Sequence, residues 1–266
     1  MSRRVRTMVH LSDLHFGARR CTVDRVYGMV RRLVASKVDQ VLVTGDITHR
    51  GYRHEFDAFR NLFEPLRDRL TIVPGNHDRL GDDAGNDMMP NERVRVELNA
   101  GMYLVRVDST GPHNRFLLAS HGQITSEDLD AIESALDAAP PHHLRVVMLH
   151  HHPVPLPEEQ LCERLSTMIG WPYATELQTG RHLLERVAGR CDLVLHGHRH
   201  RPSHRVVGTT RGRVHVLNAG DSLTLGAARQ FSYRGEELSL PPSWLPLGSA
   251  RDQRGSSASP RATVAA

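Results

Sequence analysis

The sequence predicts an α/β fold, in one domain with a short appendage, on three observations. Short apolar runs rich in valine, isoleucine and leucine recur along the chain, as buried strands do. The segments between the first runs carry apolar residues three and four positions apart, which is the spacing of a helix face packed on a core. The length of 266 residues suffices for one sizeable hydrophobic core and favours one domain over two.

The first part of the chain alternates strand and helix. The predicted elements are a strand at 5–11, a helix at 22–36, a strand at 40–44, a helix at 54–67 and a strand at 70–73. Thr22, or the residue before it, can cap the first helix. A strand, a helix and a strand in succession form a parallel pair with a right-handed crossover. The ends of these strands therefore meet at one edge of a sheet.

The rest of the chain adds further strands and two helices. Strands are predicted at 102–108, 115–119, 144–149 and 191–195, and a closing antiparallel set at 203–207, 213–217 and 230–233. A helix opens at 125–128, where Thr-Ser-Glu-Asp has capping chemistry, and another spans 176–188. The polar loop at 79–92 is either a lid over a site or an ordinary surface loop.

The folded domain is expected to span residues 1–236. The remaining segment, 237–266, is rich in proline, serine, glycine and alanine and shows no periodicity. Because such a segment buries too little apolar surface to offset the entropy of ordering, a disordered C-terminal tail is expected there.

Composition predicts a cytoplasmic protein without a membrane partner. Charged residues make up 24% of the chain, and no apolar run is long enough to span a bilayer. The basic start is followed by a short apolar stretch at 8–11 that contains His10, which does not match a signal peptide. Cys21, Cys162 and Cys191 lack a CxxC spacing, which favours reduced thiols over a disulfide framework or a zinc ribbon.

Charge and aromatic content indicate the kind of partner. The formal net charge of +4 favours a small anionic substrate. Aromatic residues make up only 5% of the chain, and no basic stripe is interleaved with them, so a nucleic-acid partner is not expected. The sequence leaves the oligomeric state open.

Side chains that bind metals follow five of the predicted strands. They are Asp13 and His15, then Asp46, then Asn76 with His77, then His150 to His152, and finally His198 with His200. Each group alone has an ordinary explanation as a turn or a helix cap. Five such groups at the same end of their strands disfavour that explanation and predict a metal site at the sheet edge.

The donor set predicts two metal ions drawn from Mn, Fe, Zn and Co. It contains no thiolate, unlike a structural zinc site, and it is not built of oxygens alone, unlike a calcium site. Two ions about 3.5 to 4 Å apart need a ligand that binds both, and a carboxylate suits this role. Asp46 is the bridging ligand that the sequence favours.

These residues fall in blocks that resemble the signature of the calcineurin-like metallophosphoesterases. The blocks are Asp13-x-His15, Gly45-Asp46, Gly75-Asn76-His77-Asp78, His151-x-Pro153 and Gly197-His198-x-His200. The set is most similar to the bacterial cyclic-AMP phosphodiesterases, which are class III cyclic nucleotide phosphodiesterases. The resemblance implies a sandwich of two mixed β-sheets flanked by helices, with the active site at the carboxyl ends of strands.

The resemblance also implies a metal role for each block. One metal would be held by Asp13, His15, His200 and Asp46, and the other by Asn76, His151, His198 and again Asp46. His151 precedes the proline by two positions, as the family ligand usually does. His150 is the alternative if its strand ends one residue earlier, because neighbours in a strand point to opposite faces.

The implied reaction is the hydrolysis of a phosphodiester of a small molecule by a hydroxide that bridges the two metals. A cyclic nucleotide or a glycerophosphodiester would be a substrate of this type. His77 would protonate the leaving alkoxide, and Asp78 would orient the His77 imidazole. Arg50, Asn76 and His77 are the expected substrate-binding residues.

Some features of the sequence favour a phosphodiesterase and others favour a phosphatase. Asp78 stands where the serine/threonine phosphatases typically carry glutamate, and His121-Gly122 is similar to the phosphodiesterase group. Arg50 instead matches the phosphate-binding arginine of the phosphatases, and 48–51 departs from the Thr-Asp-x-Gly pattern of the cyclic-nucleotide group. A phosphomonoesterase or protein phosphatase-like hydrolase using Arg50, and a nuclease, are therefore alternatives. A non-catalytic binding module is the least expected, because every block is intact.

Overall fold

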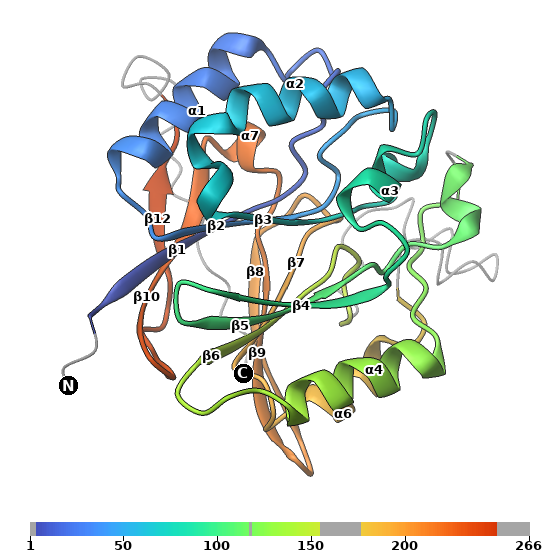
Figure 1. Ribbon diagram of the computed structural model, residues 1–266, viewed down its shortest axis with the longest axis vertical. Helices are drawn as coiled ribbons and strands as arrows, with labels where there is room; N and C mark the ends of the chain where they lie inside the picture. The colour runs from blue at the N-terminus through green and yellow to red at the C-terminus, as the bar shows by residue number, and fades with distance from the viewer. Residues whose placement is uncertain (1–3, 117–118, 155–176, 249–266) are drawn as a thin grey trace.

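Two β-sheets with helices on their outer faces make up the architecture of the protein (Figure 1). The computed structural model describes residues 4–116, 119–154 and 177–248. Within these residues each sheet contains six strands, and an apolar layer lies between the two sheets. The predicted sandwich of two mixed sheets flanked by helices is confirmed.

The first sheet combines strands from both ends of the chain. Its strands are β1 (Arg6–Leu11), β2 (Gln40–Thr44), β3 (Leu70–Val73), β10 (Ala227–Arg234), β11 (Glu237–Leu238) and β12 (Ser243–Pro246). β1, β2 and β3 are parallel, and β10 pairs with β1 in the antiparallel sense. The helices α1 (Val23–Ala35), α2 (Arg53–Phe63) and α7 (Ser222–Leu225) lie over its outer face (Figure 1).

The second sheet has a parallel centre and antiparallel edges. Its strands are β4 (Val94–Asn99), β5 (Met102–Val107), β6 (Leu144–Met148), β7 (Leu193–His196), β8 (Ser203–Thr209) and β9 (Gly212–Asn218). β5, β6, β7 and β9 are parallel, while β4 and β8 form the two edges. The helices α4 (Ser126–Asp137) and α6 (Gly180–Val187) cover its outer face.

The helices α1 and α4 begin where the sequence supplies capping groups. The Thr22 side chain accepts a hydrogen bond from the Arg25 N–H at 3.4 Å, at the start of α1. At the start of α4, the side chains of Thr125 and Asp128 each accept the backbone N–H of the other and so form a capping box, which confirms the capping chemistry predicted at 125–128. Both helices then bury one apolar stripe against their sheet.

The strands are apolar on both faces because the sheets are covered on both sides. Leu42 of β2 packs in the layer between the sheets, whereas its neighbours Val41 and Val43 pack under α1 and α2. Met148 and Val147 of β6 divide in the same way between the inner layer and the cluster under α4 and α6. This double burial explains the continuous apolar runs in the sequence.

The carboxyl ends of strands from both sheets meet at one edge of the sandwich. The Asp13 N–H after β1 donates to the Gly45 carbonyl after β2 at 3.1 Å. The His150 ring, after β6 in the second sheet, places Nδ1 2.7 Å from the carbonyl oxygen of Thr44 in the first. The loops after these strands are therefore held together by direct hydrogen bonds.

Two predicted elements differ from the structure, and one strand of the structure was not predicted. The strand predicted at 115–119 is wrong at its start, because Pro112–Arg115 forms a 3₁₀ helix, η3, in which Pro112 occupies the first turn. The helix predicted at 54–67 ends at Phe63 and continues as a second 3₁₀ helix, η1 (Glu64–Arg69), because Pro65 cannot donate an interior helical hydrogen bond. β4 was not among the predicted strands.

The predicted domain boundary at residue 236 is wrong. β11 and β12 follow it, and β12 pairs with β10 along four residues. Leu245 and Leu247 of this segment are buried in the core under α1 and α2, and the Arg229 guanidinium lies 4.8 Å from the centre of the Trp244 ring. Long-range pairing and burial thus order a segment that has no periodicity of its own. The expected disorder of 249–266 lies outside the described residues, as do the stretch 155–176 and Cys162.

The loop predicted at 79–92 is packed on the core. It contains the helix α3 (Ala84–Met88), whose Ala84 and Met88 are buried. Arg79 pairs with Asp108 and with Asp83, the latter at 2.9 Å. These contacts favour the surface-loop interpretation over the lid. Within the described ranges, no helix is long and apolar enough to cross a membrane.

The segment after residue 236 should contribute measurably to stability. We expect Leu245→Ala to lower the free energy of unfolding by about 2 to 5 kcal/mol, because it removes buried methyl groups and leaves a cavity. Urea denaturation of the two proteins measures this difference. The exposed Glu237→Ala is the control and should stay within about 0.5 kcal/mol of the parent. An unchanged unfolding curve for Leu245→Ala would contradict the packing of β12.

Candidate metal centre

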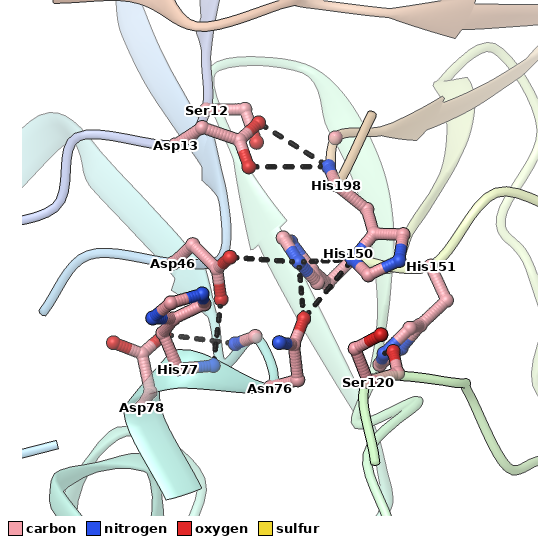
Figure 2. Close-up of polar contacts among 12 residues, drawn as sticks. Ser12, Asp13, Asp46, Asn76, His77, Asp78, Ser120, His150, His151 and His198 are labelled. Carbon is pink, nitrogen blue, oxygen red and sulfur yellow. Dashed lines mark hydrogen bonds and ion pairs between the residues drawn. The ribbon is translucent and has the colours of Figure 1, made fainter. Parts of the chain in front are cut away.

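The candidate site lies in the loops that follow β1, β2, β3, β6 and β7. Figure 2 shows Asp46 near the middle of the group, with His77 on one side and His150, Asn76 and His198 on the other. The described residues form three groups of possible metal ligands, and two of these groups, called clusters below, share Asp46. The sheet edge that the sequence predicted is therefore where these residues meet.

The first cluster consists of Asp13, His15, Asp46 and His200, each offering one ligand atom within 4.8 Å of the others. His200 Nε2 lies 3.3 Å from Asp13 Oδ1 and 3.2 Å from His15 Nε2. His15 Nε2 lies 3.9 Å from Asp46 Oδ2. These are the four residues expected to hold one metal.

The second cluster consists of Asp46, His150 and His198, with Asn76 beside them. His150 Nε2 lies 3.4 Å from Asp46 Oδ2 and 3.2 Å from Asn76 Oδ1. His198 Nδ1 lies 3.0 Å from the same Asn76 oxygen. Asp46 belongs to both clusters, which is the position expected of a bridging carboxylate.

The fourth-block histidine in this cluster is His150, which corrects the expectation of His151. β6 ends at Met148, one residue earlier than predicted, so the alternation of side chains turns His150 toward Asp46. Both ring nitrogens of His151 are engaged elsewhere: Nδ1 lies 2.9 Å from Ser109 Oγ, and Nε2 lies 3.1 Å from the Ser120 carbonyl oxygen. Figure 2 shows the His151 ring beside Ser120.

His77 is held next to Asp46 by its backbone and its ring. Its N–H donates to Asp46 Oδ1 at 2.9 Å. Its ring Nδ1 lies 2.8 Å from the His49 carbonyl oxygen, so Nδ1 carries a proton and Nε2 is the ring nitrogen that this bond leaves free of the carbonyl. The His49 carbonyl therefore fixes the tautomer of His77.

Asp78 does not orient the His77 ring, which corrects its expected role. The Asp78 carboxylate is fully buried and accepts four hydrogen bonds, from the N–H groups of Ile47, Thr48 and Gly75 and from the Thr48 hydroxyl, at 2.7 to 3.2 Å. Burial and the nearby charge of Asp46 raise the Asp78 pKa to about 6, against the effect of these hydrogen bonds. Asp78 joins the loop after β2 to the loop after β3.

The backbone is left-handed at five of the cluster residues. Their φ angles are 59° at Asp13, 50° at His15, 50° at Asp46, 77° at His198 and 54° at His200. For a residue other than glycine this conformation costs about 1 to 2 kcal/mol. Hydrogen bonds between loops offset this cost, such as the His15 N–H to the Asp46 carbonyl at 2.9 Å. The strain turns ligand side chains toward a common centre.

Burial and charge set the protonation states in the clusters. Burial lowers the pKa of His15 and His198 well below the ordinary value, so both rings are neutral at pH 7 and offer a lone pair. Burial acts the same way on His150, but the Asp46 carboxylate outweighs it and raises the His150 pKa to about 9. Conversely, burial would raise the Asp46 pKa, but His150 holds it well below its usual range.

These protonation states fit a site for cations. Asp13 and Asp46 are buried with 0% and 2% of their surface exposed, so their charges require a positive partner. Neutral imidazoles, carboxylates and one amide oxygen are the ligands of Mn, Fe, Zn and Co sites. Because His150 carries a proton near neutral pH, binding of a cation there releases that proton.

His49 and Arg50 lie at the more exposed side of the site. His49 forms a third group with His15 and His77, and its ring stacks on His77 with centroids 5.7 Å apart. The sequence predicted no role for His49, although the segment 48–51 that contains it departs from the family pattern. Arg50 is exposed, and in the described part of the chain no hydrogen bond or ion pair holds its guanidinium. Its expected contact with substrate stays a prediction.

The family model of the calcineurin-like phosphoesterases matches residues 6–202, which include every ligand of both clusters. The chain belongs to this family. The structure of a dimetal phosphatase from Danio rerio is similar to it, with a TM-score of 0.57 and 11% identity over 91% of this chain and 99% of that one. At this identity the likeness concerns the fold alone.

Curated relatives within the family are named as phosphodiesterases. The chain is 31% identical over 163 residues to the 3′,5′-cyclic adenosine monophosphate phosphodiesterase CpdA of Pseudomonas aeruginosa, which covers 56% of each protein. It is 29% identical over 178 residues to the glycerophosphodiester phosphodiesterase GpdQ of Enterobacter lignolyticus, covering 58% of this chain and 59% of that protein. The chain thus spans about half the length of the curated relatives it matches.

Replacement of single histidines should distinguish the two fourth-block candidates. We expect His150→Asn to lose about one metal ion per chain, because it removes a ligand from the second cluster. His151→Asn is the matched control and should retain both ions, since its side chain can still bond to Ser109. Metal content after dialysis, measured by plasma mass spectrometry on folded protein, tests this. Loss of metal from His151→Asn alone would reverse the assignment.

Replacement of Asp78 should lower the stability of the fold, because Asp78 holds two loops together and makes no hydrogen bond to the His77 ring. Asp78→Asn puts an amide N–H₂ where donors converge, so each lost hydrogen bond to the charged group removes about 1.5 to 3 kcal/mol. We expect a lower unfolding midpoint in metal-free protein, where metal loss cannot contribute. Thr48→Ser keeps the hydroxyl donor and should unfold near the parent midpoint. A parental midpoint with a reduced turnover rate would instead restore the orienting role for Asp78.

Proposed function

We propose that this protein is a metal-dependent phosphodiesterase that hydrolyses a small anionic diester of the cyclic nucleotide or glycerophosphodiester type. The observation that carries the proposal is the sharing of Asp46 between two adjacent ligand clusters, with His77 bonded to the same carboxylate. The names of the curated relatives support the diester class. The free thiols of Cys21 and Cys191 support a cytoplasmic location.

The proposed cofactors are two metal ions drawn from Mn, Fe, Zn and Co. Asp13, His15 and His200 would hold one, Asn76, His150 and His198 the other, and Asp46 both. When bound, such ions polarise phosphate oxygens and lower the pKa of a coordinated water toward neutrality. The burial of Asp46 and His150 excludes solvent from this side of the site, which strengthens each electrostatic interaction there.

His77 is the group that would supply the proton to the leaving oxygen. The His49 carbonyl holds Nδ1–H, so a protonated His77 can release only its Nε2 proton without breaking this bond. The backbone bond from His77 N–H to Asp46 fixes the distance between this acid and the shared carboxylate. The position of His77 beside the residue common to both clusters supports this proposed role as proton donor.

Two variants separate chemistry from metal binding. His77→Asn can still donate to the His49 carbonyl, and we expect it to keep two metals per chain and to lose about 10² to 10⁴ in turnover rate. Asp46→Asn should lose both metals and activity together, because the neutral amide cannot bridge two cations. Retention of two metals by Asp46→Asn would show that another residue is the bridge.

The substrate class can be tested on chelator-treated protein. We expect metal-dependent hydrolysis of bis-p-nitrophenyl phosphate to exceed that of p-nitrophenyl phosphate when manganese is restored. Cyclic nucleotides and glycerophosphodiesters are then the next substrates to compare. A preference for the monoester would favour a phosphatase in which Arg50 binds phosphate, and Arg50→Ala would then raise KM. No turnover of either compound with any divalent metal would overturn the enzymatic proposal.

A further inference from the structure

β4 is an edge strand whose outer side has no partner in the described part of the chain. It pairs with β5 alone, in the antiparallel sense, from Val94 opposite Val107 to Asn99 opposite Met102. Figure 1 shows the β4–β5 hairpin between β3 and α4. An open edge presents unpaired N–H and C=O groups that can pair with another strand.

The hairpin geometry identifies the outward backbone groups. Ala100 and Gly101 form a two-residue turn with φ angles of 48° and 76°, so Asn99 and Met102 are a hydrogen-bonded pair. Pairs alternate along the ladder, and the Asp108 N–H bond to the Arg93 carbonyl, at 2.7 Å, continues the same series. The backbone groups of Val94, Val96 and Leu98 therefore point away from β5, to the open edge.

The same residues expose apolar surface. Val96 is 41% exposed and Leu98 is 60% exposed, although both lie on the face of the sheet that α4 partly covers. Val94, on the same face, packs against the core under α4 and α6. An edge that combines free backbone groups with exposed branched side chains is suited to strand addition.

We propose that β4 pairs with β4 of a second copy of this chain, antiparallel about a two-fold axis that passes between the two Val96 residues. In this register Val96 faces Val96 of the partner, and Val94 faces Leu98 of the partner. The N–H and C=O groups of these three residues then bond across the axis in both directions. The interface is isologous, as in most symmetric dimers.

The charges on the other face of β4 select this register. With Val96 on the axis, Arg95 of each copy stands opposite Glu97 of the other, which favours pairing. A shift that places residue 95 on the axis puts Arg95 opposite Arg95, and a shift to residue 97 puts Glu97 opposite Glu97. Like charges directly opposite are destabilising, so both neighbouring registers are disfavoured. The strand is thus complementary to itself in one register.

The sheet edges at β3 and β8 lack these features. The first sheet ends at β3, where Arg106 Nε donates to the outward Ile72 carbonyl at 2.9 Å and so occupies the edge. The second sheet ends at β8, which exposes Val206 by 52% but contains no acidic residue to face Arg205 across a two-fold axis. β8 therefore provides a matched control edge within the same sheet.

The association can be measured by sedimentation equilibrium of the full chain. We expect a reversible increase in mass from 29.8 kDa toward twice that value as the concentration rises. Val96→Lys places two lysines opposite each other at the axis and should weaken the dimer at least about tenfold, as a 1.4 kcal/mol penalty would. Val206→Lys on β8 should leave the association unchanged. A parent protein that stays monomeric at about 500 μM would overturn the proposal.

A mixing experiment tests the register. Arg95→Glu alone sets Glu against Glu97 of its partner, and Glu97→Arg alone sets Arg against Arg95, so each variant should be monomeric. Their mixture restores opposite charges at both positions and should yield a heterodimer. Glu97 also accepts a bond from Thr71 at 2.9 Å and forms an ion pair with Arg106 at 3.6 Å within the same chain, so the thermal midpoint of Glu97→Arg is checked first.

The result remains decisive if Glu97→Arg fails to fold, because the comparison of Arg95→Glu and Val96→Lys with Val206→Lys still locates the interface. Dimerisation weakened by Val206→Lys and unaffected by Val96→Lys would assign it to β8. Persistence of the dimer in every variant would place it elsewhere on the surface. Either outcome refutes the pairing of β4.

Discussion

The buried carboxylate of Asp78 is the interaction on which the site depends. It accepts hydrogen bonds from the N–H groups of Ile47 and Thr48 in the loop after β2. It also accepts one from the Gly75 N–H in the loop after β3. A buried carboxylate without these donors would be unstable, and the donors without the carboxylate would be buried unpaired. The two loops that carry Asp46 and Asn76 are therefore held together by bonds within the protein, which do not require a bound cation.

A fixed frame is needed because the ligand residues are strained. Asp13, His15 and Asp46 all have left-handed backbones, which a flexible loop would relax. The Asp13 and His15 N–H groups donate to the carbonyls of Gly45 and Asp46, so the loop after β1 is held by the same loop that Asp78 anchors. The free energy of packing two sheets thus maintains a local geometry that the sequence alone would not prefer.

The sequence predicted which groups of residues form the site. It did not predict details that depend on contacts between segments far apart in the chain. Parallel strands bring Asp13 and Asp46 to one edge of the first sheet, and that inference requires strand polarity alone. His198 follows β7 of the second sheet, so its approach to them also requires the packing of the two sheets. The choice between His150 and His151 depends on where β6 ends. There, the N–H groups of both residues turn to Ser109 Oγ at 3.2 Å, a group 41 and 42 positions away. No local pattern could reveal that contact.

The other differences have the same physical origin, with one exception. β12 is ordered by pairing with β10 and by burial of Leu245, neither of which is visible in a segment without periodicity. Asp78 follows His77 in the chain, which suggested contact, yet its partners come from another loop. β4 is the exception, because the strict alternation of apolar and polar residues over Val94–Asn99 is itself the pattern of a half-buried strand.

Close packing also explains why glycine stands beside ligands in the family blocks. A side chain at Gly75 would overlap Oδ1 and the backbone nitrogen of Asp46, and one at Gly197 would overlap Ser12 Oγ. Each glycine therefore leaves space for a loop that follows another strand and carries a candidate ligand. Only glycine at these two positions leaves room for the close approach of the loops that brings Asp46 into both clusters. The glycines of these short motifs are therefore required by contacts with loops that follow other strands.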